Sequence, residues 1–304
     1  MTFILMYHRV CTAGPSTAAY FARGTAVEQE VFARQVAWLA ERYRLVSLVE
    51  ALAIPDRDDE VEAVAITFDD GYSDVFDAAL PVCRAHKAPL AVFPVADHLA
   101  DASSAIWFDV YYDLLHKAQI HGPVHHADLG LKTSSCALPP GEDLMWWVRG
   151  PFKKRLQAMD VGARGHVLEQ LGVTLDAVPT TALASRLYLS FEQLADLSLE
   201  GHLIGGHGRT HTRLDDNTVR LVDDEISASI SLLDRLRISS PRVFCYPDGG
   251  VDTAVESLVG AAGFAWALTV EPGRHDLSGD RYRVPRLLMR NVLPGDPGWP
   301  SSLS

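Results

Sequence analysis

The sequence predicts an α/β fold built on a parallel sheet or barrel. Short apolar runs of β-prone residues, such as 3–6, 64–66 and 90–93, alternate with segments whose apolar residues recur at helical spacing, and this alternation is typical of strand–helix–strand units. Acids, histidines and glycines directly follow several of these runs. Because parallel α/β folds place their active sites beyond the carboxyl ends of the strands, these residues are the candidates for a functional site.

The elements before residue 100 can be assigned in order. Apolar residues at helical spacing between Phe32 and Tyr43 predict an amphipathic helix, and Leu45-Val46 predicts a brief strand after it. Another helix is expected from Ser73, with Pro81 either kinking it or starting a new helix.

The alternation breaks between about 103 and 186, where we expect a helical insertion that forms a lid or one wall of a cleft. Residues 107–115 and 146–156 have helical spacing, the second segment with the basic run Lys153-Lys154-Arg155, and no strand pattern stands out. The loop between them holds His121, His125 and His126. These histidines could bind a metal, although loop histidines are usually solvated. The insertion leaves one barrel domain over residues 1–304.

Regular elements return at Ser190, which with Gln193 matches a helix capping box. Further helices are expected from Thr218 and over 253–262. Strands are expected at 203–204, 242–245, 264–269 and 282–289.

The composition is globular with an acidic excess. A formal net charge of −12 over 304 residues argues against nucleic acid and anionic membrane surfaces as partners, since both attract basic proteins. It favours a neutral or cationic substrate, or a bound divalent cation. No run reaches the roughly 18 apolar residues of a membrane span, and no basic leader segment is visible, so we expect a cytoplasmic protein. The four scattered cysteines form no Cys-x-x-Cys pair and are expected to be reduced, and nothing in the sequence indicates the oligomeric state.

Two adjacent acids, Asp69 and Asp70, stand at the end of the apolar run 64–66 and before Gly71. Neighbouring side chains of a strand point to opposite faces, but a bend at Gly71 would let both carboxylates reach one pocket. The alternative is an ordinary turn, since Asp-Gly is a strong turn signal.

His207 and His211 follow another predicted strand. At a spacing of four residues, one helical turn would place both imidazoles on the same face, a common way to hold a divalent metal. Two surface histidines are the alternative for this pair alone. An acid and two histidines at strand ends would leave metal positions open for water and substrate.

These motifs resemble those of the polysaccharide deacetylases, carbohydrate esterase family four. Thr67-Phe68-Asp69-Asp70-Gly71 and His207-x-x-x-His211 are similar to the first two family motifs, and Tyr246-Pro247-Asp248-Gly249 is similar to the third. The resemblance runs from Met6 to about Thr269, the insertion excepted. It implies a distorted (β/α) barrel of about seven strands, and a metal-dependent hydrolase that removes acetyl groups from an N-acetylated sugar, oligosaccharide or polysaccharide.

The resemblance also implies residue roles. Asp70, His207 and His211 would bind the metal, usually Zn²⁺ with Mn²⁺ or Co²⁺ as alternatives, and Asp69 would be the general base. A divalent cation lowers the pKa of bound water toward ~7 and polarises the amide carbonyl, while a carboxylate beside it accepts the water's proton. A backbone N–H must also stabilise the oxyanion, and its candidate source is the loop of Tyr246, Pro247 and Asp248.

The general acid departs from the common family pattern. Typical members carry a histidine in a C-terminal motif, but residues 286–290 contain none. His8, in Tyr7-His8-Arg9 after the first strand, resembles the N-terminal acid of circularly permuted members, so we predict that His8 is the acid. A capping or core histidine is the alternative, and His275 is a weaker candidate.

Two other positions depart from the family. Cys245 stands where an arginine usually orients the base; Arg286 or Arg290 could replace it, or could form surface ion pairs. Asp248 occupies a place that is often aromatic.

Two alternative functions stay open. One is a metal-dependent hydrolase of a small non-sugar amide or imide. The other is a non-catalytic carbohydrate-binding protein on the same fold, which would be expected to lose metal ligands that are all present here.

Overall fold

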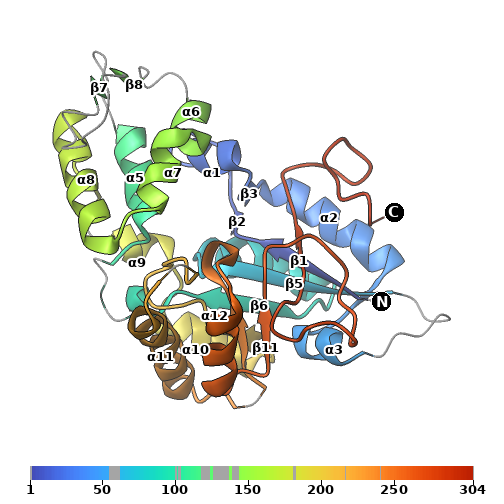
Figure 1. Ribbon diagram of the computed structural model, residues 1–304. Coiled ribbons are helices and arrows are strands. Elements are labelled where there is room, and N and C mark those ends of the chain that lie inside the picture. Colours follow the sequence, from blue (N-terminus) through green and yellow to red (C-terminus); the bar gives the residue numbers. More distant parts are fainter. Residues whose placement is uncertain are drawn as a thin grey trace.

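The computed structural model describes residues 2–54, 62–99, 101, 104–117, 124–125, 137–138, 144–180, 183–215, 217–239 and 241–303. These residues form an α/β fold around parallel strands, with helices on several sides (Figure 1). No helix in these ranges has the length and apolar character needed to cross a membrane. The predicted α/β class is therefore confirmed.

The main sheet is parallel, in the order β12-β1-β5-β6-β9, with a short strand β4 also paired to β5. Single parallel bridges continue it, because Gly206 after β9 pairs with Phe244 in β10, and Leu268 in β11 pairs with Val284 before β12. The strands are thus arranged as a distorted barrel in which β10 and β11 are joined to the main sheet only by these single bridges. Its strands are β1 (Thr2–Tyr7), β5 (Ala63–Asp70), β6 (Leu90–Pro94), β9 (Leu203–Ile204), β10 (Val243–Cys245), β11 (Trp266–Leu268) and β12 (Leu287–Leu288).

Alternating side chains divide the core between the two faces of these strands. In β5, Val64, Ile66 and Phe68 join the large cluster under the outer helices, whereas Ala63 and Ala65 join a smaller cluster on the other face. The same alternation holds in β6, as expected for strands buried on both sides. The helices that cover the outer face are α2 (Gln29–Arg42), α4 (Leu80–Ala85), α10 (Phe191–Leu199), α11 (Val219–Arg235) and α12 (Thr253–Ala261), whereas the buried residues of α3 (Leu48–Ala53) join the smaller cluster.

Most of the sequence assignments are confirmed within one or two residues. The capping box at Ser190 and Gln193 is present, and α4 starts at Leu80 after a π-helical turn over Val75–Ala79, so Pro81 marks a new helix. The expected strand over 282–289 is wrong in extent, because only Leu287–Leu288 pair as a strand. Three further short strands are β2 (Arg9–Val10), β3 (Ala26–Val27) and β4 (Arg44–Leu45).

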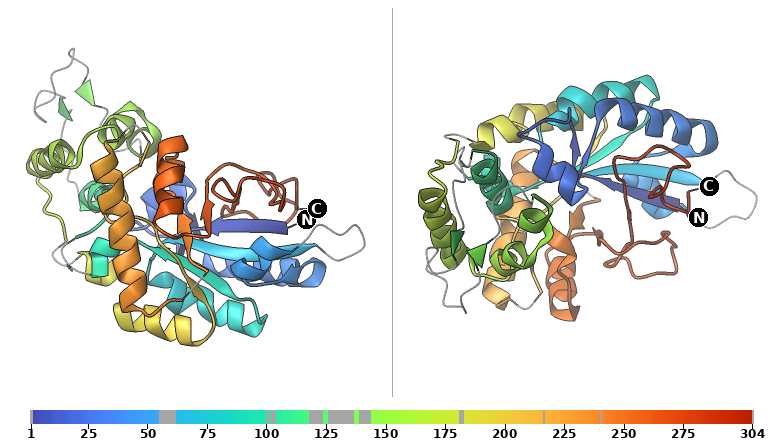
Figure 2. Two further views of the ribbon diagram at one scale, coloured as in Figure 1. Left: turned by 60° about the horizontal axis from the view of Figure 1, so that its bottom comes forward. Right: turned by 90° about the horizontal axis from the view of Figure 1, so that it is seen from above.

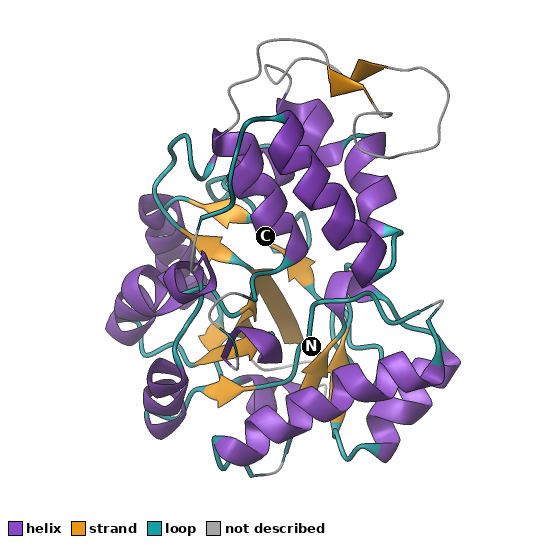
Figure 3. Ribbon diagram, turned by 90° about the vertical axis from the view of Figure 1, so that its left-hand side faces the viewer, coloured by secondary structure: helices purple, strands orange, loops and turns teal. Residues whose placement is uncertain are grey.

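The insertion is helical and stands beyond the carboxyl ends of the barrel strands (Figure 2). Seen from the side of the insertion, its helices lie beside one end of the strands (Figure 3). Its helices are α5 (Trp107–Lys117), α6 (Leu144–Arg149), α7 (Pro151–Gln157), α8 (Val161–Thr174) and α9 (Leu183–Leu187), and α1 (Ala18–Arg23) packs against α6. The expectation of no strand here is wrong, since β7 (Val124–His125) pairs with β8 (Ala137–Leu138). His121 and His126 lie outside the described residues, and the side chain of His125 is not described.

A buried carboxylate ties the insertion to the barrel. Asp109 of α5 is 1% exposed and accepts hydrogen bonds from the hydroxyls of Tyr20, Tyr72 and Tyr188. Burial raises the pKa of Asp109 to about 6, although the hydrogen bonds from Tyr188 and Tyr20 act in the opposite direction. The three tyrosines come from α1, from the turn after β5 and from the residue after α9, so this carboxylate sets the position of α5 beside the strand ends.

Candidate active site

Asp69 and Asp70 are the last residues of β5, and both are buried. Asp70 has φ +70° and Gly71 has φ +77°, so the strand alternation ends at Asp70, one residue earlier than the predicted bend. Both carboxylates line the same cleft. Gly71 is required twice over: a Cβ there would lie 2.8 Å from Cβ of Pro94, and its left-handed backbone disfavours other residues.

His207 and His211 lie in the loop after β9, and their ring centroids are 5.0 Å apart. The predicted helical turn between them is wrong, because this segment is irregular and His211 itself has φ +60°. Nε2 of His211 lies 3.1 Å, and Nε2 of His207 3.4 Å, from Oδ1 of Asp70. The loop therefore brings together the three side chains that the sequence predicted as ligands.

Two polar residues of α11 hold this histidine loop in shape. Glu225 is 4% exposed and accepts hydrogen bonds from the backbone N–H groups of Arg209 and Thr210 at 2.7 and 3.0 Å. The Ser229 hydroxyl accepts the N–H of Gly208 at 3.0 Å. Sequence reasoning missed both residues, although a glutamate on the apolar face of an amphipathic helix is a signal for a buried role.

The donor set fits a divalent metal. Asp70, His207 and His211 each offer one ligand atom, and these atoms lie within 4.8 Å of one another. Nδ1 of His207 is 2.8 Å from the Cys245 carbonyl oxygen; donation there leaves Nε2 free to coordinate, a common arrangement for histidine ligands. Oδ1 of Asp70 is buried without a hydrogen-bond donor among the described residues, as expected of an atom meant for a cation.

A second grouping of Asp69, His207 and Cys245 is also compact but fits a metal less well. Both Asp69 oxygens accept hydrogen bonds from Arg286, and Nδ1 of His207 already faces a backbone carbonyl. The carboxylate and two imidazoles of the first set suit zinc and also manganese or cobalt, with positions left for water and substrate.

Arg286 holds Asp69 in a bidentate ion pair. Nη1 and Nη2 lie 2.8 Å from Oδ1 and Oδ2 of Asp69, and Arg286 is wholly buried. Burial alone would raise the pKa of Asp69, but the Arg286 guanidinium, aided by His207 and His8, lowers the pKa below the ordinary value. Of the two arginines considered from sequence, Arg286 thus lies beside Asp69, whereas Arg290 is exposed.

His8 follows β1 and lines the same cleft as Asp69 and Asp70. Its Nδ1 is buried and has no hydrogen-bond partner among the described residues, so the geometry lends no support to a capping role. Burial lowers the pKa of His8, and the nearby Asp70 and Asp69 offset part of this effect. His275 lies elsewhere: its backbone N–H bonds to Thr2 at the amino end of β1, away from the strand ends.

The third motif contributes one free N–H. The Tyr246 N–H donates to the Leu268 carbonyl, and Pro247 has none. Asp248 lines the cleft in a left-handed conformation with φ +49°, and no acceptor for its N–H is found among the described residues. Of the three residues predicted to supply the oxyanion donor, Asp248 is therefore the remaining candidate, through its backbone N–H.

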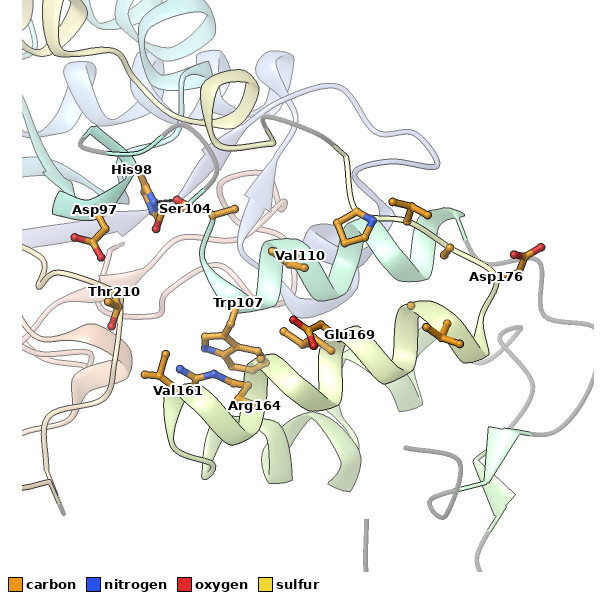
Figure 4. Close-up of a pocket in the computed structure, with 18 residues that line it drawn as sticks. Asp97, His98, Ser104, Trp107, Val110, Val161, Arg164, Glu169, Asp176 and Thr210 are labelled. Atoms are coloured by element: carbon orange, nitrogen blue, oxygen red, sulfur yellow. Dashed lines mark hydrogen bonds between the residues drawn. The ribbon is translucent and has the colours of Figure 1, made fainter. Parts of the chain in front are cut away.

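The cleft lined by His8, Asp69 and Asp70 has a volume of about 480 Å³, and helices of the insertion form one of its walls. A larger cavity of about 810 Å³ lies between α5 and α8 (Figure 4). Trp107 lines the larger cavity and Phe108 the cleft, so the start of α5 separates the two. The larger cavity has a mainly apolar lining without the acids and histidines described above, so the smaller cleft is the candidate active site.

Solved structures share this fold. A deacetylase, PplD from Streptococcus pyogenes in complex with acetate, matches at 14% identity over 95% of this chain and 92% of its own, with a TM-score of 0.62. IcaB from Ammonifex degensii matches at 17% identity over 95% and 91%, with a TM-score of 0.56. A de-N-acetylase from Aggregatibacter actinomycetemcomitans matches at 15% identity over 95% of both chains, also with a TM-score of 0.56. No curated protein sequence matches.

The sequence itself carries the family assignment. The family model described as polysaccharide deacetylase matches residues 56–136 and 156–267, which is more than half of the chain. The matched segments contain the acids of β5, the histidine loop and the third motif, while His8 and Arg286 lie outside them. The chain belongs to the polysaccharide deacetylase family.

Proposed function

We propose that this protein is a metal-dependent hydrolase that removes acetyl groups from an N-acetylated saccharide. The observation that carries the proposal is the meeting of Asp70, His207 and His211 beside the ion-paired Asp69 in one cleft. The reaction consumes one water and releases acetate and the free amine of the sugar.

Asp70, His207 and His211 would hold the divalent cation, with zinc as the first choice. When bound, the cation polarises the amide carbonyl and makes a water more acidic. The chain's own residues orient the cation ligands: the Cys245 carbonyl sets the His207 tautomer, and Glu225 and Ser229 fix the loop that carries both histidines.

Asp69 is the proposed general base. Its carboxylate is oriented by two hydrogen bonds from Arg286 and remains ionised because the pKa is lowered, so it can accept the proton of the attacking water. The Asp248 N–H is the proposed donor to the carbonyl oxygen as negative charge develops there. His8 is the proposed acid that gives a proton to the departing amine.

The test is acetate release from defined N-acetylated sugars by metal-stripped protein with zinc, manganese or cobalt added back. We expect Asp69→Asn and His8→Gln each to lower kcat at least 100-fold, the effect typical of lost general acid–base catalysis. The controls are Asp234→Asn and His166→Gln, which change exposed side chains outside the cleft.

Metal content gives a second, independent readout. Asp70→Ala should lower bound metal after dialysis, whereas Asp69→Asn should keep it because Asp69 is held by Arg286. Unchanged metal binding in Asp70→Ala, or full activity in Asp69→Asn, would overturn the proposal. Release of carboxylate from small non-sugar amides, with none from acetylated sugars, would favour the alternative hydrolase.

A further inference from the structure

The insertion places positive charge over the cleft of an acidic protein. The chain carries a net charge of −12, yet the wall built by α6 and α7 contributes Arg149, Lys153 and Lys154 to the cleft lining. Arg149 is anchored through hydrogen bonds to the carbonyls of Ala22 and Arg23, at 2.7 and 2.8 Å. In Figure 1, α6 and α7 lie next to α1 at the open end of the barrel.

Lys153 is a buried cation without an acidic partner. It is 3% exposed, and no salt bridge to it occurs among the described residues. Its Nζ lies 5.5 Å from the ring centroid of Trp107 and 6.0 Å from that of Phe108. The Trp107 ring also carries the Arg164 guanidinium at 5.0 Å, and Figure 4 shows Arg164 beside Trp107.

These ring contacts compensate the burial of Lys153 only in part. Cation–π contacts stabilise an ammonium only modestly, and removing the ammonium from water without an acidic partner costs more than such contacts contribute. A methionine would fill the same space without that cost. Packing alone therefore does not account for a lysine at position 153. Its position in the cleft wall indicates that it binds a ligand.

The three acids that line the cleft have other partners than Lys153. Asp69 is paired with Arg286, and Asp70 belongs to the metal set. The Asp248 carboxylate accepts hydrogen bonds from Gln157 at 2.7 Å and from Arg23 at 3.3 Å. The insertion wall therefore remains positive, and a bound cation would add to this charge.

We propose that Lys153, supported by Arg149 and Lys154, binds an anionic substituent of the saccharide, a phosphate or a carboxylate. The proposal deepens the proposed function and rests on it: the preferred substrate is an anionic N-acetylated sugar. Lysine ammonium groups bind phosphate as point charges, and attraction across a partly desolvated cleft is stronger than in open water. The net charge of the whole chain suggested a neutral or cationic substrate, but the local charge of the cleft predicts the opposite.

The experiment compares three substrates: N-acetylglucosamine 6-phosphate, N-acetylmuramic acid and the neutral di-N-acetylchitobiose. We expect wild type to prefer the anionic sugars, and the phosphate and carboxylate arms identify which anion is recognised. Lys153→Met should lower the ratio of anionic to neutral kcat/KM by about 10- to 100-fold, the effect of losing one charge-assisted hydrogen bond. Most of this loss should appear in KM and should shrink as salt is added.

The matched control is Arg155→Met, which removes a cation from the same helix at a position outside both cavities. It should leave the ratio unchanged. Lys154→Met, at an exposed position that folding tolerates, should lower the ratio several-fold. An equal ratio in wild type and Lys153→Met, or a neutral sugar preferred by wild type, would overturn the inference.

Binding measurements separate this inference from the proposed function. Calorimetry with N-acetylglucosamine 6-phosphate in an Asp69→Asn background needs no turnover. Weaker binding after Lys153→Met supports the anion site even if no sugar releases acetate, in which case only the proposed function fails. Urea unfolding completes the test: Lys153→Met should be at least as stable as wild type, and a clear loss of stability would show that Lys153 serves packing instead.

Discussion

Arg286 is the side chain on which the geometry of the proposed base depends, and Arg286→Met tests this. The guanidinium is wholly buried and makes five hydrogen bonds. Two go to Asp69, and the others go to the Thr67 hydroxyl, the Thr269 carbonyl and the Cys245 sulfur. Removing it leaves the Asp69 carboxylate buried without its cation.

Breaking a buried ion pair by removing one partner costs about 3–5 kcal/mol, and we expect this loss in the free energy of unfolding of Arg286→Met. Asp69 would also lose its fixed orientation, so kcat should fall on the order of 100-fold or more, as when a general base is lost. The assays are urea unfolding at constant pH and acetate release with saturating metal.

Arg283→Met is the control. Arg283 lies three residues earlier and pairs with Glu256, but both side chains are partly exposed, so its loss should cost under about 1 kcal/mol. Adding Asp69→Asn to Arg286→Met should restore part of the stability, because no unpaired charge is then buried, without restoring activity. An Arg286→Met protein within about 1 kcal/mol of wild type in stability, with its activity kept, would refute the reasoning.

Three further changes give distinct outcomes. Burial raises the pKa of Asp109 to about 6. Its contribution to the free energy of unfolding is therefore complete below the ordinary pKa near 4. This contribution, up to about 3 kcal/mol, is lost as pH rises through 6. Unfolding of Asp109→Asn should lack this decline, and parallel curves for variant and wild type would contradict the assignment. Glu225→Gln should weaken metal affinity about 10- to 100-fold in chelator competition, because it disturbs a residue that supports the metal ligands through hydrogen bonds. The control Glu169→Gln changes an exposed side chain and should keep the affinity. Equal affinities of the two variants would refute the role given to Glu225. In Gly71→Ala the new Cβ would lie on a left-handed backbone and close to the next strand, so we expect a loss of about 2–4 kcal/mol in the free energy of unfolding. In Gly201→Ala the backbone is also left-handed but the Cβ would point into open space, so the loss should be about 1 kcal/mol. Similar losses for both variants would count against the contact at Gly71.

Local patterns in the sequence were enough to place the strand ends and the residues on them. An apolar run followed by Asp69-Asp70-Gly71 marks a strand end, and each such end in a parallel barrel faces the same way, so acids and histidines far apart in sequence were expected to meet. The same logic placed His8 in the cleft, although its role stays a prediction. Helices with clear periodicity and caps were assigned nearly to the residue.

What the sequence could not supply is contact across long separations. Arg286 reaches Asp69 over 217 residues, and no local pattern distinguishes it from the exposed Arg290. The place of Glu225 on the apolar face of α11 indicates burial, but no local pattern identifies the loop that it supports. The histidine spacing indicated a helical turn, but hydrogen bonds from that loop to α11 impose an irregular backbone with the same convergence of side chains.

The net charge of the whole chain does not predict the charge of the cleft, because the barrel and the insertion contribute different residues to it. The barrel supplies the proposed ligands and base, while the insertion supplies Lys153 and the rest of the basic wall. The insertion is stabilised by an apolar cluster that includes Trp147 and Phe152, reaches Tyr72 and Val95 after two of the strands, and is separate from the two clusters along the strands. The unpaired charge of Lys153 on α7 therefore lowers the stability of the insertion. We expect the geometry of Asp69 and Asp70 to be unaffected. Substitutions of Lys153 are thus expected to change which saccharide is accepted while the strand-end machinery keeps its arrangement.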